Sequence, residues 1–429
     1  MNAEKKRRFS AGTLILTGII IILAGGLIGA LLYIRSQPAP ARGVAPLVDI
    51  QEGEPDSSKW GLNFPNEYST FLLTEQNNAR TSYGGAEPYS KLESDPLLLT
   101  IFAGNAFSRE YNEERGHMWS LEDVRATDRV DDKTPGTCYS CKSSNNPQLW
   151  DEMGMEAYDA TPFSELGAHI SNPIGCANCH EANTMRLIVT NPALEAALQA
   201  QDQDWRSFTR QQMRTVVCAN CHVEYYFEGD GKLLVFPWAN GTHIDEIYDY
   251  YQEEQFKDFT HRISGALMLK MQHPEYEMFT AESTHFLAGV SCADCHMPYM
   301  RDGSAKFSDH NIRSPLLNAE AACGACHTDV SFATTRVNMI QTQVYATLMN
   351  TEEALVAAIE AIGASAEAGA TEADLAEARQ LHREAQAYWD FVAAENSMGF
   401  HNPEYVLTIL AHATDVARQA QLAAALATP

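Results

Sequence analysis

The stretch TCYSCKSSN, residues 137–145, holds two cysteines three positions apart and a lysine directly after them. Four other stretches have nearly the same form but end in histidine. They are CANCH at residues 176–180, CANCH at 218–222, CADCH at 292–296 and CGACH at 323–327. All ten cysteines of the 429-residue chain lie in these five motifs, so none remains for a structural disulfide or a free nucleophile.

Two kinds of site use a CxxC pair followed by a nitrogen donor. A zinc ribbon gathers four ligands from two pairs, but five pairs cannot be divided evenly into such sites, and in an exported protein its thiolates would face oxidation. In c-type haem attachment, both thiols bond to the haem and the next residue binds the iron. Residues three apart on a helical turn share one face, which suits this attachment. The motifs therefore predict five covalently bound haem c groups.

The predicted attachment and proximal ligand residues are Cys138, Cys141, Lys142, Cys176, Cys179, His180, Cys218, Cys221, His222, Cys292, Cys295, His296, Cys323, Cys326 and His327.

The histidine count limits the other axial ligands. The chain has 14 histidines, and four lie inside the motifs. An electron-transfer haem usually has two strong axial ligands, so four such haems need four more histidines. The candidates are His117, His285, His310 and His401. Five others are interpreted as hydrogen-bonded surface or core residues: His169, His243, His261, His382 and His412.

Lys142 distinguishes one haem from the other four. A lysine amine must be neutral to bind iron, although its usual pKa is about 10.4. Burial and the charge of the iron can lower that pKa. This cost is hard to explain in a haem that only transfers electrons, so the altered ligand predicts an open iron face where chemistry occurs. The alternative is a surface lysine beside a haem that is ligated from elsewhere.

The overall charge limits the partners. The formal net charge is -26, and nucleic-acid binding requires a basic face. An anionic substrate would also be repelled at long range, so any anion site must provide its own positive charge. We therefore expect no nucleic-acid partner.

The N-terminus predicts export. A basic cluster at residues 5–8 precedes a stretch without charge at 11–34. This stretch is longer than the ~7–15 residues of a signal-peptide core and long enough for the about 20 residues of a membrane-spanning helix. It predicts an uncleaved anchor, and the alternative is a signal peptide that is cut after residues 39–41. Both interpretations place the rest of the chain on the extracytoplasmic face, in a bacterium the periplasm.

The coarse pattern predicts a mainly α protein with haems in a compact core, few short strands and long C-terminal helices. Residues 49–99 show little periodicity and predict short helices within irregular structure. Two β-rich runs flank Gly229 to Gly231 and predict a hairpin over residues 223–238. Helices are expected over residues 351–362 and from Thr371, with Gly399 as a stop signal.

Three stretches carry a resemblance to a known family. They are YNEERGHMWSLEDVRATDR (residues 111–129), CHVEYYF (221–227) and MLKMQHPEYE (268–277), together with one CxxCK followed by four CxxCH. In these the chain resembles the pentahaem cytochrome c nitrite reductases, which reduce nitrite to ammonium. The likeness runs from about residue 105 to the C-terminus.

The resemblance implies a role for individual residues. Lys142 would be the proximal ligand of the active-site haem, and Arg129, Tyr225 and His273 would be the distal residues, with Arg125 as the alternative arginine. The implied calcium ligands are Glu224, Gln272 and the main-chain oxygens of Tyr225 and Lys270. The implied second ligands of the other haems, taken from the second to the fifth motif, are His310, His117, His401 and His285.

The resemblance also implies the reaction and the partners. We expect a six-electron reduction of nitrite, with electrons from a membrane quinol-oxidising multihaem cytochrome or another donor, in a homodimer. Two alternatives stay open: a multihaem electron-transfer cytochrome without catalysis, and a related reductase that acts on hydroxylamine or sulfite.

The predicted organisation comprises a cytoplasmic basic segment (1–10), a transmembrane anchor or signal peptide (11–34), a linker (35–48), a pentahaem catalytic region (49–330) and a long-helix region that forms the dimer interface (331–429).

Overall fold

A computed structural model describes residues 20, 23, 25–27, 46–131 and 133–427. The chain divides into two units, Met1–Leu47 and Val48–Pro429, and the fold below is that of the second. The predicted anchor over residues 11–34 lies outside the described residues, apart from residues 20, 23 and 25–27. Among the described residues, no helix has both the length and the apolar character needed to cross a membrane.

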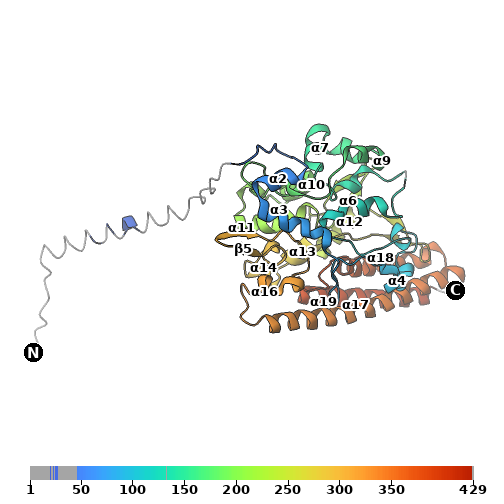
Figure 1. The fold of residues 1–429 in the computed structure, drawn as a ribbon. Coiled ribbons are helices and arrows are strands. Elements are labelled where there is room, and N and C mark those ends of the chain that lie inside the picture. The colour runs from blue at the N-terminus through green and yellow to red at the C-terminus, as the bar shows by residue number, and fades with distance from the viewer. Residues whose placement is uncertain (1–19, 21–22, 24, 28–45, 132, 428–429) are drawn as a thin grey trace, which may run out of the picture. The chain divides into compact units, whose positions relative to one another are not determined.

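Helices dominate the second unit, as the sequence predicts (Figure 1). Before the first strand the α-helices are α2 (Ser57–Asn63), α3 (Pro65–Leu72), α4 (Lys91–Ser94), α5 (Leu97–Ile101), α6 (Ser120–Ala126), α7 (Asn146–Met153), α8 (Met155–Ala160), α9 (Phe163–Leu166), α10 (Pro192–Ala200) and α11 (Arg210–Val216). After it come α12 (Ile244–Glu253), α13 (Glu275–Thr280), α14 (Thr284–Leu287), α15 (Cys292–His296), α16 (Ala319–Ala322), α17 (Val330–Glu367), α18 (Glu372–Ala393) and α19 (Pro403–Leu426).

Short 3-10 helices lie between these elements and carry several motif residues. They are η1 (Leu73–Gln76), η2 (Ala106–Ser108), η3 (His117–Trp119), η4 (Gly136–Tyr139), η5 (Gly167–His169), η6 (Cys176–Asn178), η7 (Trp205–Ser207), η8 (Val217–Asn220) and η9 (Pro315–Asn318).

The described strands form three separate antiparallel pairs. They are β1 (Tyr226–Glu228) with β2 (Leu233–Val235), β3 (Phe259–Thr260) with β4 (Leu267–Met268), and β5 (Tyr299–Asp302) with β6 (Ala305–Ser308). The first pair is the hairpin that the sequence predicts, with Tyr226 opposite Val235. Gly229 lies in its turn with a φ of +62°, a conformation that glycine adopts without steric cost.

The three C-terminal helices pack against one another and are drawn in orange to red in Figure 1. Helix α18 begins at the predicted cap, where the Thr371 hydroxyl and the Asp374 carboxylate satisfy each other's backbone N–H groups. The predicted stop is wrong: α18 ends at Ala393, and Gly399 lies in the following loop with a φ of +76°. There its α-carbon approaches the Val344 side chain, with no room for a larger residue.

Helix α17 is much longer than predicted. The sequence indicates a helix over residues 351–362, whereas the helix begins at Val330, where the Asp329 carboxylate accepts a hydrogen bond from the Phe332 N–H. Residues 330–350 contain many polar and β-branched side chains, which obscure the pattern. Their buried positions, such as Val337, Val344 and Leu348, recur at helical spacing because α18 and α19 cover that face.

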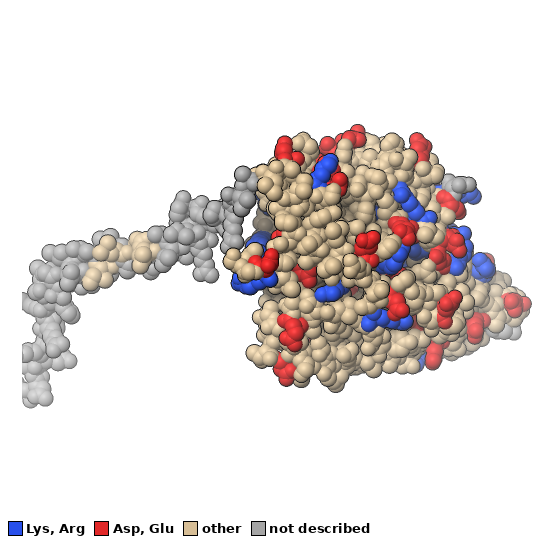
Figure 2. All heavy atoms as spheres, in the orientation of Figure 1, with Lys and Arg blue, Asp and Glu red and all other residues tan. Residues whose placement is uncertain are grey.

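The main hydrophobic core lies beneath the C-terminal helices. It joins side chains of α17, α18 and α19 to those of α5 and α12, and Ile359, Trp389 and Leu410 in it are fully buried. Burying a side chain of this size contributes roughly 1.5–3 kcal/mol. Smaller clusters lie near the motifs. On the face shown in Figure 2, basic side chains are interspersed with acidic ones, without a continuous basic surface.

Candidate functional site

All five cysteine motifs open into one cavity of about 2070 Å³. Each of the ten cysteines lines it, and none forms a disulfide. A pocket for a single small ligand measures roughly 300–1,000 Å³, so this cavity has room for several large groups. Free cysteines are usually among the most buried residues, yet nine of these are only partly buried and Cys326 is exposed, because they face the cavity.

The backbone of the histidine motifs explains how two thiols and an imidazole come to one side. The N–H groups of His180, His222 and His327 donate to the carbonyl of the first cysteine of their motif, at 2.8–3.0 Å, which closes one helical turn. In the lysine motif, the Lys142 N–H donates instead to the Tyr139 carbonyl at 2.9 Å, in a tighter turn. The lysine motif therefore differs in backbone as well as in side chain.

Each motif histidine faces one of the four candidate second ligands. The ring centroids are 6.1 Å apart for His180 and His310, 6.4 Å for His222 and His117, 6.2 Å for His296 and His401, and 6.4 Å for His327 and His285. Two imidazoles that share one metal at bonds of about 2.0 Å each have centroids roughly 6 Å apart. The side chains thus leave the space that an iron between two imidazoles needs.

The other ring nitrogens fix the orientation of several of these imidazoles. The Nδ1 atoms of His180, His296 and His310 lie 2.8–3.1 Å from the main-chain carbonyls of Met185, Arg313 and Ser308. An N–H that is bonded in this way leaves Nε2 as the nitrogen that can bind a metal.

The histidines separate into two groups around the cavity. His273 and the eight paired histidines line it, whereas the five set aside in the sequence do not. His261 instead contacts the Thr100 carbonyl at 2.9 Å, and His382 contacts the Ser264 hydroxyl at 3.0 Å and Gln386 at 3.0 Å.

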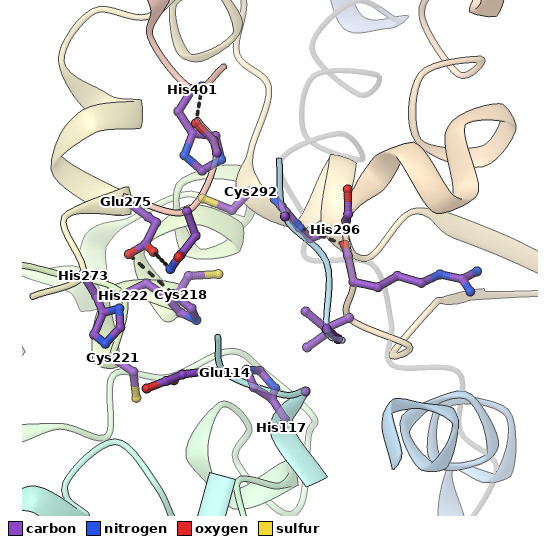
Figure 3. A pocket seen from close by; sticks show the side chains of 18 of the residues that line it. Glu114, His117, Cys218, Cys221, His222, His273, Glu275, Cys292, His296 and His401 are labelled. Carbon is purple, nitrogen blue, oxygen red and sulfur yellow. Dashed lines mark hydrogen bonds and ion pairs between the residues drawn. The ribbon is translucent and has the colours of Figure 1, made fainter. Parts of the chain in front are cut away.

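Lys142 differs from the four motif histidines because its charged partner is a carboxylate rather than an imidazole. Its Nζ atom lies 3.2 Å from the carboxylate of Glu114, a residue that the sequence analysis did not single out. Arg129, Tyr225 and His273 line the same cavity as Lys142. Figure 3 shows Glu114 and His273 among the residues that line it. Lys142 lowers the pKa of the Glu114 carboxyl most, and His273 and Arg129 add to this against the effect of burial. Three cationic or potentially cationic groups thus act on the Glu114 carboxylate and lower its pKa.

The two candidate arginines lie in different places. The Arg129 guanidinium stacks over the Phe107 ring at 4.3 Å, and its Nε donates to the Thr127 hydroxyl at 3.2 Å. Arg125 does not line the cavity, because it donates to the carbonyls of Gly167 and Ile170 at 2.9 and 2.8 Å. Of the two, only Arg129 lies where it could bind an anion in the cavity.

Three of the four predicted calcium ligands lie together. Buried Glu224 accepts hydrogen bonds from the Tyr251 hydroxyl at 2.8 Å and the Gln272 N–H at 2.6 Å. The Gln272 side-chain amide donates to the Lys270 carbonyl at 2.9 Å. Burial raises the pKa of Glu224 well above its usual value. The Lys270 ammonium does not balance this carboxylate, because it forms an ion pair with Asp390 at 2.9 Å.

This donor set suits a hard cation. It combines one carboxylate with amide and main-chain oxygens, which are ligands that calcium accepts. In residues 46–131 and 133–427, no group of three or more His, Cys, Asp and Glu side chains is arranged to hold a metal ion. The predicted calcium ligands fall outside this class, because Glu224 is their only carboxylate and the other donors are amide and main-chain oxygens.

Two further carboxylates, also missed from the sequence, approach the paired histidines. Glu275 Oε2 lies 3.7 Å from His222 Nδ1, and Glu395 Oε1 lies 2.5 Å from His401 Nδ1, without the alignment of a hydrogen bond. Figure 3 shows Glu275 pointing toward His222. Glu275 lies two residues after the predicted distal His273, and this proximity in sequence was the available signal.

Comparison with known proteins gives a consistent result. The cytochrome c552 family matches residues 56–429. Cytochrome c-552 from Parabacteroides distasonis is 39% identical over 433 aligned positions, covering 98% of this chain and 87% of that protein. Cytochrome c-552 from Bacteroides fragilis is also 39% identical, with the same coverage.

A solved structure has a similar fold. The catalytic subunit of cytochrome c nitrite reductase from Desulfovibrio desulfuricans, described for its two calcium sites, superposes with a TM-score of 0.84 at 34% identity. The match covers 89% of this chain and 88% of that subunit.

Proposed function

The chain belongs to the cytochrome c552 family, and we propose that it reduces nitrite to ammonium at a haem held by Cys138, Cys141 and Lys142. The observation that carries this proposal is the asymmetry of the cavity. Each of the four motif histidines has the ring of a second histidine 6.1–6.4 Å away, centroid to centroid, whereas the nearest charged partner of Lys142 is the Glu114 carboxylate at 3.2 Å. The similarity to a nitrite reductase subunit along almost its whole length supports the same function.

The residues of the cavity fit five haem c groups. The ten cysteines would form the thioether bonds, and the four histidine pairs would supply both axial ligands of four haems. When bound at these residues, the haem groups would supply electron transfer along the four histidine pairs and, at Lys142, an iron that could bind nitrite.

The chain's own side chains bind and orient the anion. Arg129 provides a local positive charge in a chain whose formal net charge is -26. Its guanidinium can donate two parallel hydrogen bonds to the nitrite oxygens. His273 can release a proton from its ring nitrogen to a departing oxygen, because burial holds the pKa of its imidazole below the usual value and makes the protonated ring a stronger acid. Tyr225 can donate its hydroxyl proton on the same side.

Glu114 is a further part of this site. Its carboxylate interacts electrostatically with Lys142, His273 and Arg129. Once Lys142 binds iron as a neutral amine, Glu114 would balance the charges of Arg129 and His273 when no anion is bound. An incoming nitrite would replace part of this negative charge.

A calcium ion would complete the local field. Glu224, Gln272 and the main-chain oxygens of Tyr225 and Lys270 would hold it. Because Tyr225 and His273 are chain neighbours of these ligands, the ion would also fix the backbone that carries both side chains.

The assembly and location follow from the surface and the N-terminus. The C-terminal helices expose large apolar side chains that do not line the cavity, among them Met339 at 59%, Leu422 at 61% and Leu426 at 77%, which supports their use as a dimer interface. The chain would work on the extracytoplasmic face, held there by the anchor at residues 11–34. A quinol-oxidising multihaem cytochrome of the membrane, or another donor, would supply the electrons.

The direct test combines a spectrum with an assay. Electron paramagnetic resonance of the oxidised protein should show one haem that lacks a second protein ligand, besides four low-spin haems with two. Viologen-driven turnover should consume nitrite and produce ammonium in equal amounts. Five low-spin six-coordinate haems without turnover would instead support an electron-transfer cytochrome. Faster reduction of hydroxylamine or sulfite than of nitrite would reassign the substrate.

A further inference from the structure

The four histidine pairs differ in what faces their outer ring nitrogens. In the pair of the second motif, both Nδ1 atoms contact neutral main-chain carbonyls, His180 at 3.0 Å from Met185 and His310 at 2.8 Å from Ser308. In the pairs of the third and fourth motifs, one ring faces a carboxylate: His222 faces Glu275 and His401 faces Glu395. These three pairs share the arrangement of their rings, but only those of the third and fourth motifs have a carboxylate within 4 Å of an outer ring nitrogen; Glu67 and Asp309 act on His310 at longer range.

Glu275 is held in place independently of His222. Its side chain is buried, and its Oε1 atom accepts a hydrogen bond from the Asn396 amide at 2.6 Å. The Oε2 atom, which lies 3.7 Å from His222 Nδ1, has no hydrogen-bond partner among the described residues. Asn396 thus leaves one carboxylate oxygen free to face the imidazole.

Glu395 is held in a similar way next to His401. It is buried, and the Ser397 hydroxyl and N–H donate to its two carboxylate oxygens at 2.8 and 3.1 Å. Because Glu395 and Asn396 are adjacent, the single loop between α18 and α19 reaches both histidine pairs. This loop therefore holds both carboxylates in place, Glu275 through Asn396 and Glu395 through Ser397, beside two of the proposed haem sites.

A carboxylate beside a metal-bound imidazole changes the metal. It makes the imidazole a more basic ligand and stabilises the more positive, oxidised state of the iron. Burial strengthens this effect, because water screens the charge less. A main-chain carbonyl fixes the ring but carries no net charge.

We propose that Glu275 and Glu395 are positioning residues that lower the reduction potentials of the haems of the third and fourth motifs relative to that of the second. The inference rests on the proposed ligation of those haems by His222 and His401. Glu275 also links one of them to the catalytic loop, since its N–H donates to the His273 carbonyl at 2.8 Å. The haem nearest this loop would then be a strong electron donor to the Lys142 site.

The test is a redox titration of the holoprotein, monitored by electron paramagnetic resonance, in Glu275→Gln, Glu395→Gln and the double variant. Each single substitution is expected to raise most the potential of the haem whose imidazole it faces, so the largest shifts should fall on different haems. Because Glu275 also acts on His296 and His401, Glu275→Gln should shift the haem of the fourth motif by a smaller amount. We expect a change of about tenfold in the equilibrium between oxidised and reduced iron, which is about 59 mV for one electron. Glu377→Gln removes the same charge from an exposed position on α18 and should shift none of them.

Several outcomes would overturn the inference. These are unchanged potentials in both variants, an equal shift of all haems, or the largest shift falling on the same haem in both variants. If Glu275→Gln does not yield holoprotein, Glu275→Asp keeps the charge further from the ring and should shift the same haem by less; no shift there would also contradict the inference. Haem content and nitrite turnover of the unaltered protein are measured separately, so failure of the proposed function is distinguishable.

Discussion

The C-terminal helices and the motif region have opposite kinds of interior. Between α17, α18 and α19, the interior consists of the chain's own side chains, and Ile359, Trp389 and Leu410 are fully buried. In the motif region the centre is a cavity of about 2070 Å³, bordered by ten cysteines, none of them fully buried. One region can be stable through its own hydrophobic core, whereas the other needs bound groups to fill its centre.

The two kinds of interior correspond to two kinds of sequence pattern. A helical stripe such as Leu375, Ala378 and Leu381 specifies its own partner surface. A CxxC motif specifies a partner that is not part of the chain. The haems would therefore be structural as well as catalytic. Substitutions in the two regions should then have different effects on haem content, stability and turnover.

The largest effect should follow from removing one attachment site. In Cys176→Ala/Cys179→Ala the second haem is not held covalently, so the cavity loses one of the groups that fill it. We expect loss of nearly all folded holoprotein and rapid cleavage within residues 49–330, whereas fragments that contain α17, α18 and α19 persist. Limited proteolysis followed by mass spectrometry measures this. Equal resistance of both regions would contradict the proposed difference.

The next largest effect concerns the lysine motif alone. Lys142→Ala removes the proximal ligand but leaves the thioether bonds, so we expect full haem content and a loss of nitrite turnover of at least about 100-fold. The measurements are haem content per chain, the electron paramagnetic resonance signal of the active-site haem and the viologen assay. Lys257→Ala at an exposed position is the control. Unchanged turnover in Lys142→Ala would remove the basis of the enzyme interpretation.

A matched pair of arginine variants separates a role in the cavity from a role in the scaffold. Arg129→Ala removes a charged contact to the anion, worth about 1.5–3 kcal/mol, and should lower kcat/KM for nitrite by roughly 10- to 100-fold. Arg125→Ala should lower the denaturation midpoint, since two main-chain carbonyls lose their donor, and should leave kcat/KM nearly unchanged. The opposite result would exchange the roles of the two residues.

Removing the calcium ligand should have a smaller effect. Glu224→Ala takes away the one carboxylate of the predicted set, so we expect loss of bound calcium, full haem content and an approximately tenfold lower turnover. Metal analysis of the purified protein and the viologen assay measure these quantities, and Glu254→Ala, at the exposed residue directly after α12, is the control. Normal activity in a protein that contains no calcium would mean that these residues do not form a metal site.

Much of the site could be predicted because cysteine spacing and family resemblance act locally. The four histidine pairs were predicted from short stretches and lie opposite each other in the fold. Glu114, Glu275 and Glu395 could not be identified in this way. A carboxylate in an acidic chain carries no signal of its own, and only the fold brings it beside Lys142, His222 or His401.

The fold shows the same limit. The hairpin around Gly229 and the cap at Thr371 depend on a few adjacent residues and were predicted correctly. The beginning of α17 and the end of α18 depend on packing between helices, so the sequence placed both wrongly. A glycine such as Gly399 is favourable both at a helix end and at a close approach, and only the neighbouring Val344 shows which role it has here.

The smallest effect on the cavity should come from a change in the C-terminal core. Leu355 in α17 is fully buried in the main core, and it does not line the cavity. Leu355→Ala should lower the free energy of unfolding by about 2–5 kcal/mol, because a void remains where the side chain was, and Ile359→Val by about 0.5–1.5 kcal/mol. Neither substitution should alter the haem spectrum or kcat, because the main core would stabilise the fold and contributes neither Leu355 nor Ile359 to the lining of the cavity. Denaturant unfolding and the viologen assay test this together. A decrease in kcat that parallels the loss of stability would mean that the two regions act as one, and the proposed difference between them would not hold.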